Sequence, residues 1–151
     1  MIPAAFKLFA DVTGDSFWET AVSTNLKHLS QCQNATSGLM PDWCDWSSHK
    51  AADNTGAAVS GGKGGFFDDA ARTPWRMAMA YNWYGIKEAK QVNDKIVPWL
   101  EKSTYGDANM IWPGYSLDGA LLILVLLTLT SLFLNVYVVK FCRVVVVNLL
   151  I

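Results

Sequence analysis

Charge is distributed very unevenly along this chain of 151 residues. Residues 1–119 hold all 13 acidic residues and 10 of the 12 lysines and arginines, a formal charge of 10 − 13 = −3. Residues 120–151 hold only Lys140 and Arg143. The first part therefore has the composition of one globular domain, and the second part does not. Because the whole chain carries a net charge of only −1, we do not expect nucleic acid as a partner.

Apolar residues recur at helical spacing in the first part, where no segment alternates convincingly like a strand. Trp18, Val22, Leu26 and Leu29 give one such stripe. We therefore expect an all-α fold of helical pairs joined by loops. The expected helices cover about residues 3–11, 17–33, 73–84 and 86–102.

Local signals mark where these helices start and stop. Ser16 and Glu19 fit a capping box at the start of the second helix. Thr73 followed by proline fits an N-cap, and Gly85 ends that helix. Pro98 should kink or shorten the last helix, because proline lacks the amide that the helix interior needs.

A polar segment rich in Gly, Ser, Asn and Asp covers residues 34–65 and shows no periodicity. A loop of this length in a compact domain is usually functional or disordered. Trp43 and Trp46 favour function or docking, since disordered linkers rarely carry indoles.

The three cysteines are Cys32, Cys44 and Cys142. They form no CxxC pair and no Cys/His cluster with zinc spacing, so we expect neither a metal site nor a cofactor. A bridge between Cys32 and Cys44 suits an oxidising compartment, but two buried free thiols are the preferred interpretation.

The stretch GGFFDDAARTPWRMAMAYNWYG, residues 64–85, carries the chemistry. Asp69, Arg72 and Arg76 would share one face of a helical backbone. The neighbouring guanidinium would keep the carboxylate ionised, as a general base requires, and aromatic faces suit sugar rings. The alternative is an acid at a helix start that only stabilises the helix dipole and pairs with Arg72.

The same stretch resembles the signature of glycoside hydrolase family eight: aromatic residues, then Asp-Ala-x-Arg, then a helix ending in Trp-Tyr-Gly. Two further segments agree in order and spacing, SQCQNATSGLMPDWCDWS at 30–47 and GDANMIWPGYSLDG at 106–119. The resemblance covers about residues 4–119.

This resemblance implies an (α/α)6 barrel that cleaves β-1,4-linked glucan, xylan or chitosan with inversion, outside the cell or in the cell envelope. It implies that Asp69 is the general base and that Arg72 binds sugar. We add Asp68, Trp43 and Phe67 as substrate-binding candidates. We expect a β-linked polysaccharide or oligosaccharide as the partner.

Three departures from the family pattern affect this interpretation. Asp68 stands where the family often has Tyr, and Ala80 stands where its helix commonly carries Asp. The family's general acid is a Glu in a Gly-rich segment far upstream, and none of Glu19, Glu88 and Glu101 lies in a matching motif. We therefore expect a fragment of the C-terminal half of a barrel, whose uncovered helix faces favour self-association.

The segment ALLILVLLTLTSLFLNVYVV, residues 120–139, holds no charge over twenty residues. It passes the length test for a transmembrane helix, with positive residues following it. A truncation or a change of reading frame near residue 119 is an alternative, and a buried helix or strand pair is another. We divide the chain into a partial hydrolase domain, 1–119, and this apolar tail, 120–151. A non-catalytic carbohydrate-binding or membrane-tethered module is the competing function.

Overall fold

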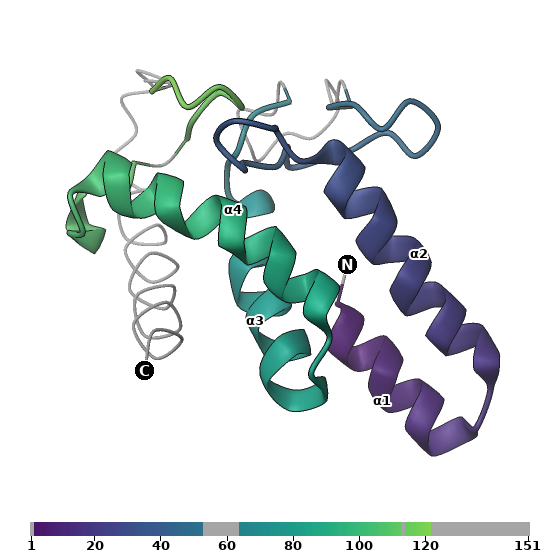
Figure 1. Ribbon diagram of the computed structural model, residues 1–151. Coiled ribbons are helices and arrows are strands. Elements are labelled where there is room, and N and C mark those ends of the chain that lie inside the picture. Colours follow the sequence, from purple (N-terminus) through teal and green to yellow (C-terminus); the bar gives the residue numbers. More distant parts are fainter. Residues whose placement is uncertain (1, 53–63, 113, 122–151) are drawn as a thin grey trace, which may run out of the picture.

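Two antiparallel helical pairs form the body of the protein, as a computed structural model shows (Figure 1). The structure describes residues 2–52, 64–112 and 114–121. The helices are α1 (Pro3–Thr13), α2 (Ser16–Cys32), α3 (Thr73–Tyr84) and α4 (Lys87–Thr104), with short 3-10 turns η1 (Ala70–Arg72) and η2 (Ala108–Met110). All four predicted helices are confirmed, and the described residues contain no β-strand, only isolated bridges.

A tight turn joins α1 to α2. Gly14 adopts a left-handed conformation (φ 68°), and the Asp15 side chain accepts a hydrogen bond from the Phe17 amide at 2.8 Å. Asp15 is therefore the N-cap, and the predicted capping box of Ser16 and Glu19 is wrong. Glu19 instead accepts a hydrogen bond from Lys7.

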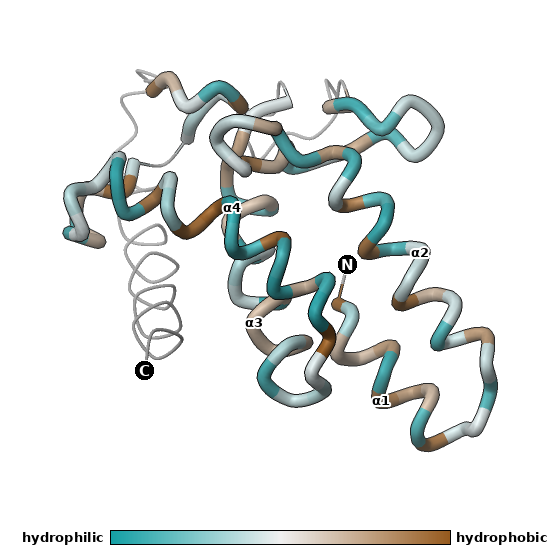
Figure 2. Tube along the Cα trace, in the orientation of Figure 1, coloured by the Kyte–Doolittle hydropathy of each residue, from teal (hydrophilic) through white to brown (hydrophobic). Residues whose placement is uncertain are grey.

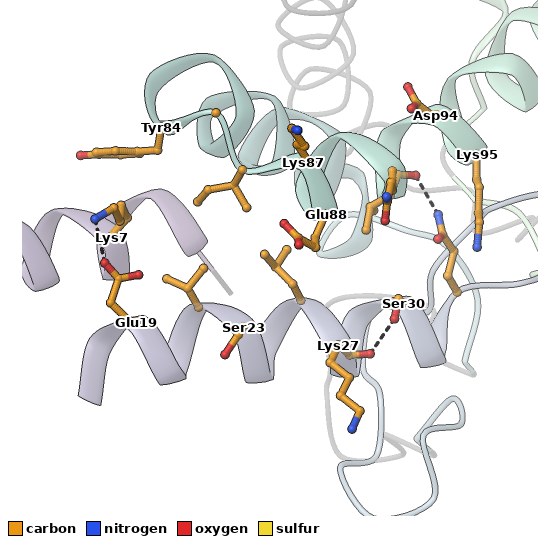
Figure 3. A pocket seen from close by; sticks show the side chains of 17 residues that line it. Lys7, Glu19, Ser23, Lys27, Ser30, Tyr84, Lys87, Glu88, Asp94 and Lys95 are labelled. Carbon is orange, nitrogen blue, oxygen red and sulfur yellow. Dashed lines mark hydrogen bonds and ion pairs between the residues drawn. The ribbon is translucent and has the colours of Figure 1, made fainter. Parts of the chain in front are cut away.

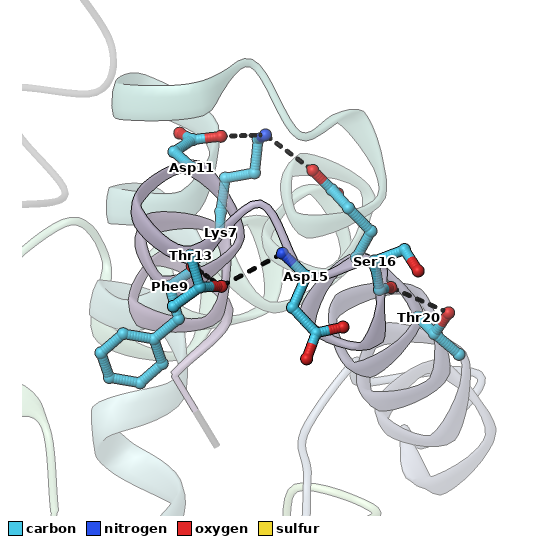
Figure 4. Close-up of polar contacts among 8 residues, drawn as sticks. Lys7, Phe9, Asp11, Thr13, Asp15, Ser16 and Thr20 are labelled. Carbon is cyan, nitrogen blue, oxygen red and sulfur yellow. Dashed lines mark hydrogen bonds and ion pairs between the residues drawn. The ribbon is translucent and has the colours of Figure 1, made fainter.

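Lys7 ties the two helices of this pair together. Its ammonium group lies 2.6 Å from Asp11 on α1 and 2.7 Å from Glu19 on α2 (Figure 4). The Trp18 ring also packs against Phe6 and Phe9 across the pair. The exposed ion pairs contribute little, so aromatic packing dominates this contact.

The start of the second pair differs from the sequence prediction. Thr73 is the first residue of α3 rather than its N-cap, because the turn η1 runs directly into the helix. Gly85 ends α3 in a left-handed conformation (φ 67°), as predicted. Pro98 does not shorten α4, which continues to Thr104. Pro98 lies on the exposed side of α4, where water can bind the carbonyl left without a partner.

The main core lies where the two pairs meet, with α1 packed against α3 and the apolar stripe of α4 turned inward (Figure 2). Met77, Ala80, Ala89 and Ile96 are fully buried there. The other buried members of this core are Ala4, Val22, Leu26, Leu29, Met40 and Val92.

The connection from α2 to α3 and the segment after α4 gather at one end of the helices (Figure 1). The Gln33 side chain donates to the carbonyls of Gly38 (2.8 Å) and Val92 (2.9 Å), which fixes this connection to α4. The Ser37 hydroxyl donates to the Leu117 carbonyl at 2.6 Å. A second small core of Leu39, Phe66, Ala70 and Tyr115 lies beneath these loops. This loop end carries the candidate site.

The apolar tail falls almost wholly outside the described residues, which end at residue 121. The prediction of a transmembrane helix over 120–139 therefore concerns residues that the structure does not describe. Within the described ranges, no helix has the length and apolar character needed to cross a bilayer.

Candidate active site

A groove of about 320 Å³ lies at the loop end, between the end of α2, the following loop and the start of α3. Asp69, Arg72 and Arg76 line it from one side, and Trp43 lines it from the loop. The remaining lining residues are Leu29, Cys32, Met40, Pro41, Asp42, Cys44, Ala70 and Thr73. Two segments distant in sequence, 29–44 and 69–76, thus supply one concave surface with both acidic and basic side chains.

The backbone around Asp69 is helical, as the spacing argument required. Asp69 has φ −74° and ψ −42°, η1 follows, and α3 begins at Thr73. This geometry places the Asp69 carboxylate in an ion pair with the Arg72 guanidinium three residues later. The Asp69 side chain is 35% exposed and that of Arg72 is 44% exposed, so both groups remain open to a ligand.

Arg76 lies one turn further along the same groove. Its Nε atom is buried and has no hydrogen-bond partner among the described residues. Burial, with a smaller effect of Arg72, lowers the pKa of Arg76 below the ordinary value for arginine. Arg76 thus adds a second guanidinium to the lining of the groove, and guanidinium N–H groups suit the recognition of hydroxyl groups.

Asp42 holds the segment that carries Asp69. Its Oδ1 atom accepts hydrogen bonds from the backbone amides of Phe67 (3.1 Å) and Ala70 (2.8 Å). A carboxylate that accepts two amide hydrogens across 28 residues of chain fixes the start of α3 against the loop. Sequence reasoning missed this role; the only signal was the acid within Pro-Asp-Trp.

Asp68 and Phe67, two of the predicted substrate-binding residues, do not line this groove. Phe67 is buried, and its ring lies against the backbone of Gly65 and Gly114, where any Cβ would collide with it. Asp68 is exposed beside the groove. Desolvation and then the Asp42 carboxylate raise the pKa of Asp68, while Arg72 lowers it.

Two tryptophans of the loop are half exposed. Trp43 is 51% exposed and Trp46 is 54% exposed, although large apolar side chains usually lie inside. Trp43 borders the groove, whereas Trp46 packs over His28 with ring centroids 4.2 Å apart. Among the described residues that line the groove, Trp43 is therefore the only aromatic one.

A disulfide joins Cys32 at the end of α2 to Cys44 in the loop, and both residues line the groove. The preferred interpretation of two free thiols is wrong. The end of α2 and the loop bring the two Cα atoms to 6.2 Å, a separation that a disulfide spans without distortion of the backbone. His28 lies against this bridge, with its Nε2 atom 3.7 Å from the sulfur of Cys32.

A larger groove of about 920 Å³ runs between α2 and α4 (Figure 3). Lys7, Glu19, Lys27, Lys87 and Glu88 lie around it. Neither Asp69 nor any tryptophan lines it, so it lacks the combination of carboxylate, guanidinium and indole found in the smaller groove. We therefore place the candidate site in the smaller groove.

Comparison with known proteins agrees with this geometry. The model of the family described as glycosyl hydrolases family 8 matches residues 1–113, which include every residue of the smaller groove. The chain belongs to this family.

Family 8 relatives include Endoglucanase C of Ruminiclostridium cellulolyticum, 33% identical over 118 residues. Endoglucanase 2 of Ruminiclostridium josui is 34% identical over 118 residues. Each alignment covers 78% of this chain and 23% of the relative. The chain therefore spans about a quarter of the length of the curated relatives that it matches.

Solved structures of the family share this arrangement of helices. The apo structure of a β-1,3-1,4-glucanase from Paenibacillus sp. X4 superposes with a TM-score of 0.68 at 24% identity, over 81% of this chain and 35% of that one. A GH8 xylobiose complex from Teredinibacter turnerae gives a TM-score of 0.61 at 24% identity, over 80% of this chain and 30% of the other. The four helices are therefore part of an (α/α)6 barrel, as the sequence resemblance implied.

Proposed function

We propose that this chain supplies the general-base side of the catalytic groove of an inverting endo-β-1,4-glucanase of the cellulase type. The observation that carries the proposal is the position of Asp69. Its partly exposed carboxylate is paired with Arg72 in a groove bordered by the exposed indole of Trp43. A base for glycoside hydrolysis needs this access, because it must hold a water against the anomeric carbon.

Each group has a separate task in this scheme. The Asp69 carboxylate takes a proton from the attacking water. Arg72 and Arg76 bind sugar hydroxyls with fixed donors, and Trp43 offers an apolar face to a sugar ring. Asp42 touches no reacting atom in this scheme and positions the Asp69 segment through its two amide hydrogen bonds.

The proposal leaves the general acid unassigned. Among the residues that line it, all within the described part of the chain, none is a glutamate. Glu19 is paired with Lys7, and Glu88 lines the larger groove. We therefore assign none of them as the acid, and we predict little hydrolysis of natural glycans by this chain alone.

The substrate class follows from the relatives. Their names describe endoglucanases, and the solved relatives include a β-1,3-1,4-glucanase and an exo-oligoxylanase. We propose a β-linked polysaccharide as substrate, degraded outside the cell or in its envelope. Cellulose, xylan, chitosan and mixed-linkage glucan are the glycans to compare.

An activated substrate tests the base without the acid. A dinitrophenyl β-cellobioside needs no protonation of its leaving group, so its hydrolysis should depend on Asp69 even where natural glycans are not cleaved. We expect slow release of dinitrophenol that Asp69→Asn lowers at least about 100-fold, since a positioned base contributes about 10² to 10⁴. Asp11→Asn, an exposed acid on α1, is the matched control and should retain the rate. Equal rates for Asp69→Asn and the control would refute the assignment.

A carbohydrate-binding module without chemistry is the second candidate. The exposed Trp43 and Trp46, with no glutamate in the groove, favour it. Calorimetric titration with cello-oligosaccharides separates the two functions. Binding that survives Asp69→Ala and is lost in Trp43→Ala, without any hydrolysis of the activated substrate, supports the binding module.

Self-association remains a further prediction. Leu8, Phe9, Val12 and Phe17 are 42% to 76% exposed near the turn between α1 and α2. Apolar surface of this kind, uncovered in a partial barrel, favours contact with another protein surface. Sedimentation velocity at several concentrations tests it, and a concentration-independent monomer would contradict it.

A further inference from the structure

Three metal-binding side chains converge at the end of α2, beside the groove. His28 and Cys32 lie one helical turn apart on the same face of α2, and Cys44 reaches them from the loop. The imidazole nitrogen and the two sulfur atoms all lie within 4.8 Å of one another. We propose that, once the Cys32–Cys44 disulfide is reduced, His28, Cys32 and Cys44 form a site for Zn²⁺ or a similar thiophilic divalent ion.

The separations of the donor atoms fit tetrahedral zinc. Zinc binds sulfur at about 2.3 Å and imidazole nitrogen at about 2.0 Å, which places two such ligands about 3.5 Å apart. His28 Nε2 and Cys32 Sγ already lie 3.7 Å apart. After reduction the two sulfur atoms must move apart, and Cys44 lies in a loop outside the helices. Three protein ligands leave the fourth position of the metal for water.

His28 is oriented in the way that metal-binding histidines usually are. Its ring is 3% exposed, and its Nδ1 atom lies 2.9 Å from Nδ1 of His49, so Nε2 is directed at the sulfurs. When Nε2 of His28 binds a metal, its Nδ1 atom carries the hydrogen and donates a hydrogen bond to Nδ1 of His49. His49 holds this position from a left-handed backbone conformation (φ 54°), which is uncommon for a residue other than glycine.

A neighbouring indole also restricts the His28 ring. The Trp46 indole covers the ring on one side, at 4.2 Å between centroids.

Reduction of the disulfide by a phosphine consumes one water molecule, which supplies the oxygen of the phosphine oxide and the two protons of the thiols. A dithiol supplies two electrons and two protons and leaves as its own disulfide. Zn²⁺ then displaces the two thiol protons, and the Zn–S bonds form with both thiolates. Cys32 and Cys44 can therefore form a disulfide or bind a metal, but not both at once. Because both cysteines also line the groove with Trp43, the exchange takes place beside the candidate active site.

Cobalt titration tests the site. The starting protein should carry Cys142→Ser, so that Cys32 and Cys44 are the only thiols. After reduction with a phosphine and removal of the excess, Co²⁺ should bind at one equivalent with thiolate-to-cobalt charge-transfer absorption and tetrahedral visible bands. Zn²⁺ should then remove both signals. The oxidised form of the same protein should give neither signal and is the matched control.

Single variants identify the ligands. Cys44→Ser should abolish the charge-transfer signal of a tetrahedral site, and His28→Gln should weaken cobalt binding at least about 10-fold. His49→Gln should weaken binding about 10- to 100-fold, as loss of the group that orients a metal-binding histidine does elsewhere. Circular dichroism of each oxidised or reduced variant shows whether the helices persist.

Three outcomes would overturn the proposal. One is a reduced, helical protein that gives no charge-transfer band. Another is binding that Cys44→Ser and His28→Gln leave unchanged, which identifies cobalt held elsewhere. The third is a reduced protein that loses its helical signal and does not recover it when Zn²⁺ is added.

Discussion

The Oδ1 atom of Asp42 accepts a hydrogen bond from the backbone amide of Ala70 at 2.8 Å, and thereby connects the loop after α2 to the start of α3. The same oxygen accepts the Phe67 amide at 3.1 Å. These two bonds bracket Asp68 and Asp69. The position of the proposed base therefore depends on a carboxylate that has no part in the reaction itself.

Replacing Asp42 by alanine should cost about 3 kcal/mol of unfolding free energy. Two amides in a partly buried segment would lose a charged acceptor, and hydrogen bonds to charged groups contribute about 1.5 to 3 kcal/mol each. Urea denaturation measures the loss. Asp107→Ala is the control, because Asp107 caps only the exposed turn η2 and should cost about 1 kcal/mol. Equal losses would contradict the role assigned to Asp42.

Gly38→Ala should destabilise the protein far more than Gly106→Ala. Both glycines have left-handed backbones, with φ 72° and 74°, so both substitutions carry about 1 kcal/mol of backbone strain. A Cβ at Gly38 would also lie 2.5 Å from the carbonyl carbon of Lys95 on α4, whereas Gly106 faces open space. We expect a loss of about 3 kcal/mol or more at Gly38. Similar melting temperatures for the two variants would show that the loop does not pack closely on α4.

Gln33→Met should cost about 2 kcal/mol, because it removes the donor shared by the Gly38 and Val92 carbonyls in a buried setting. The side chains are similar in length, so packing changes little. Gln31 lies on the exposed side of α2, so Gln31→Met should change the free energy of unfolding by no more than about 0.5 kcal/mol. Chemical denaturation of the two variants provides the comparison, and equal effects would exclude a structural role for the Gln33 amide.

Asp68→Asn should stabilise the protein at neutral pH. Because the folded state raises the pKa of Asp68 above its ordinary value of 3.8, ionisation of Asp68 costs more in the folded protein than in the unfolded one. Protonated Asp68 favours the folded protein relative to the ionised form. This stabilisation is fully present below pH 3.8 and is lost as the pH rises through the pKa of Asp68 in the folded protein. Since the carboxylate is exposed, we expect a gain below about 1 kcal/mol at pH 7. Melting temperatures of both proteins between pH 3 and pH 7 should converge at the acid end; a constant difference would contradict the shift.

Four helices and the segment that carries the candidate catalytic residues were predictable from the sequence. Helical spacing, Pro3 and Gly85 fixed four helices to within a few residues, because these signals act over one or two turns of local backbone. The spacing of Asp69, Arg72 and Arg76 also predicted their common face, since a helical backbone alone decides it.

The residues from distant segments that share the groove could not be predicted, because tertiary packing brings them together. The Cys32–Cys44 bridge, the hydrogen bonds of Asp42 and the convergence of His28 with the two sulfurs all join segments separated by a loop. The burial of Phe67 likewise depends on the approach of Gly114 from the segment that follows α4. Local periodicity carries no information on such contacts, because they depend on how the loops close over the helix ends.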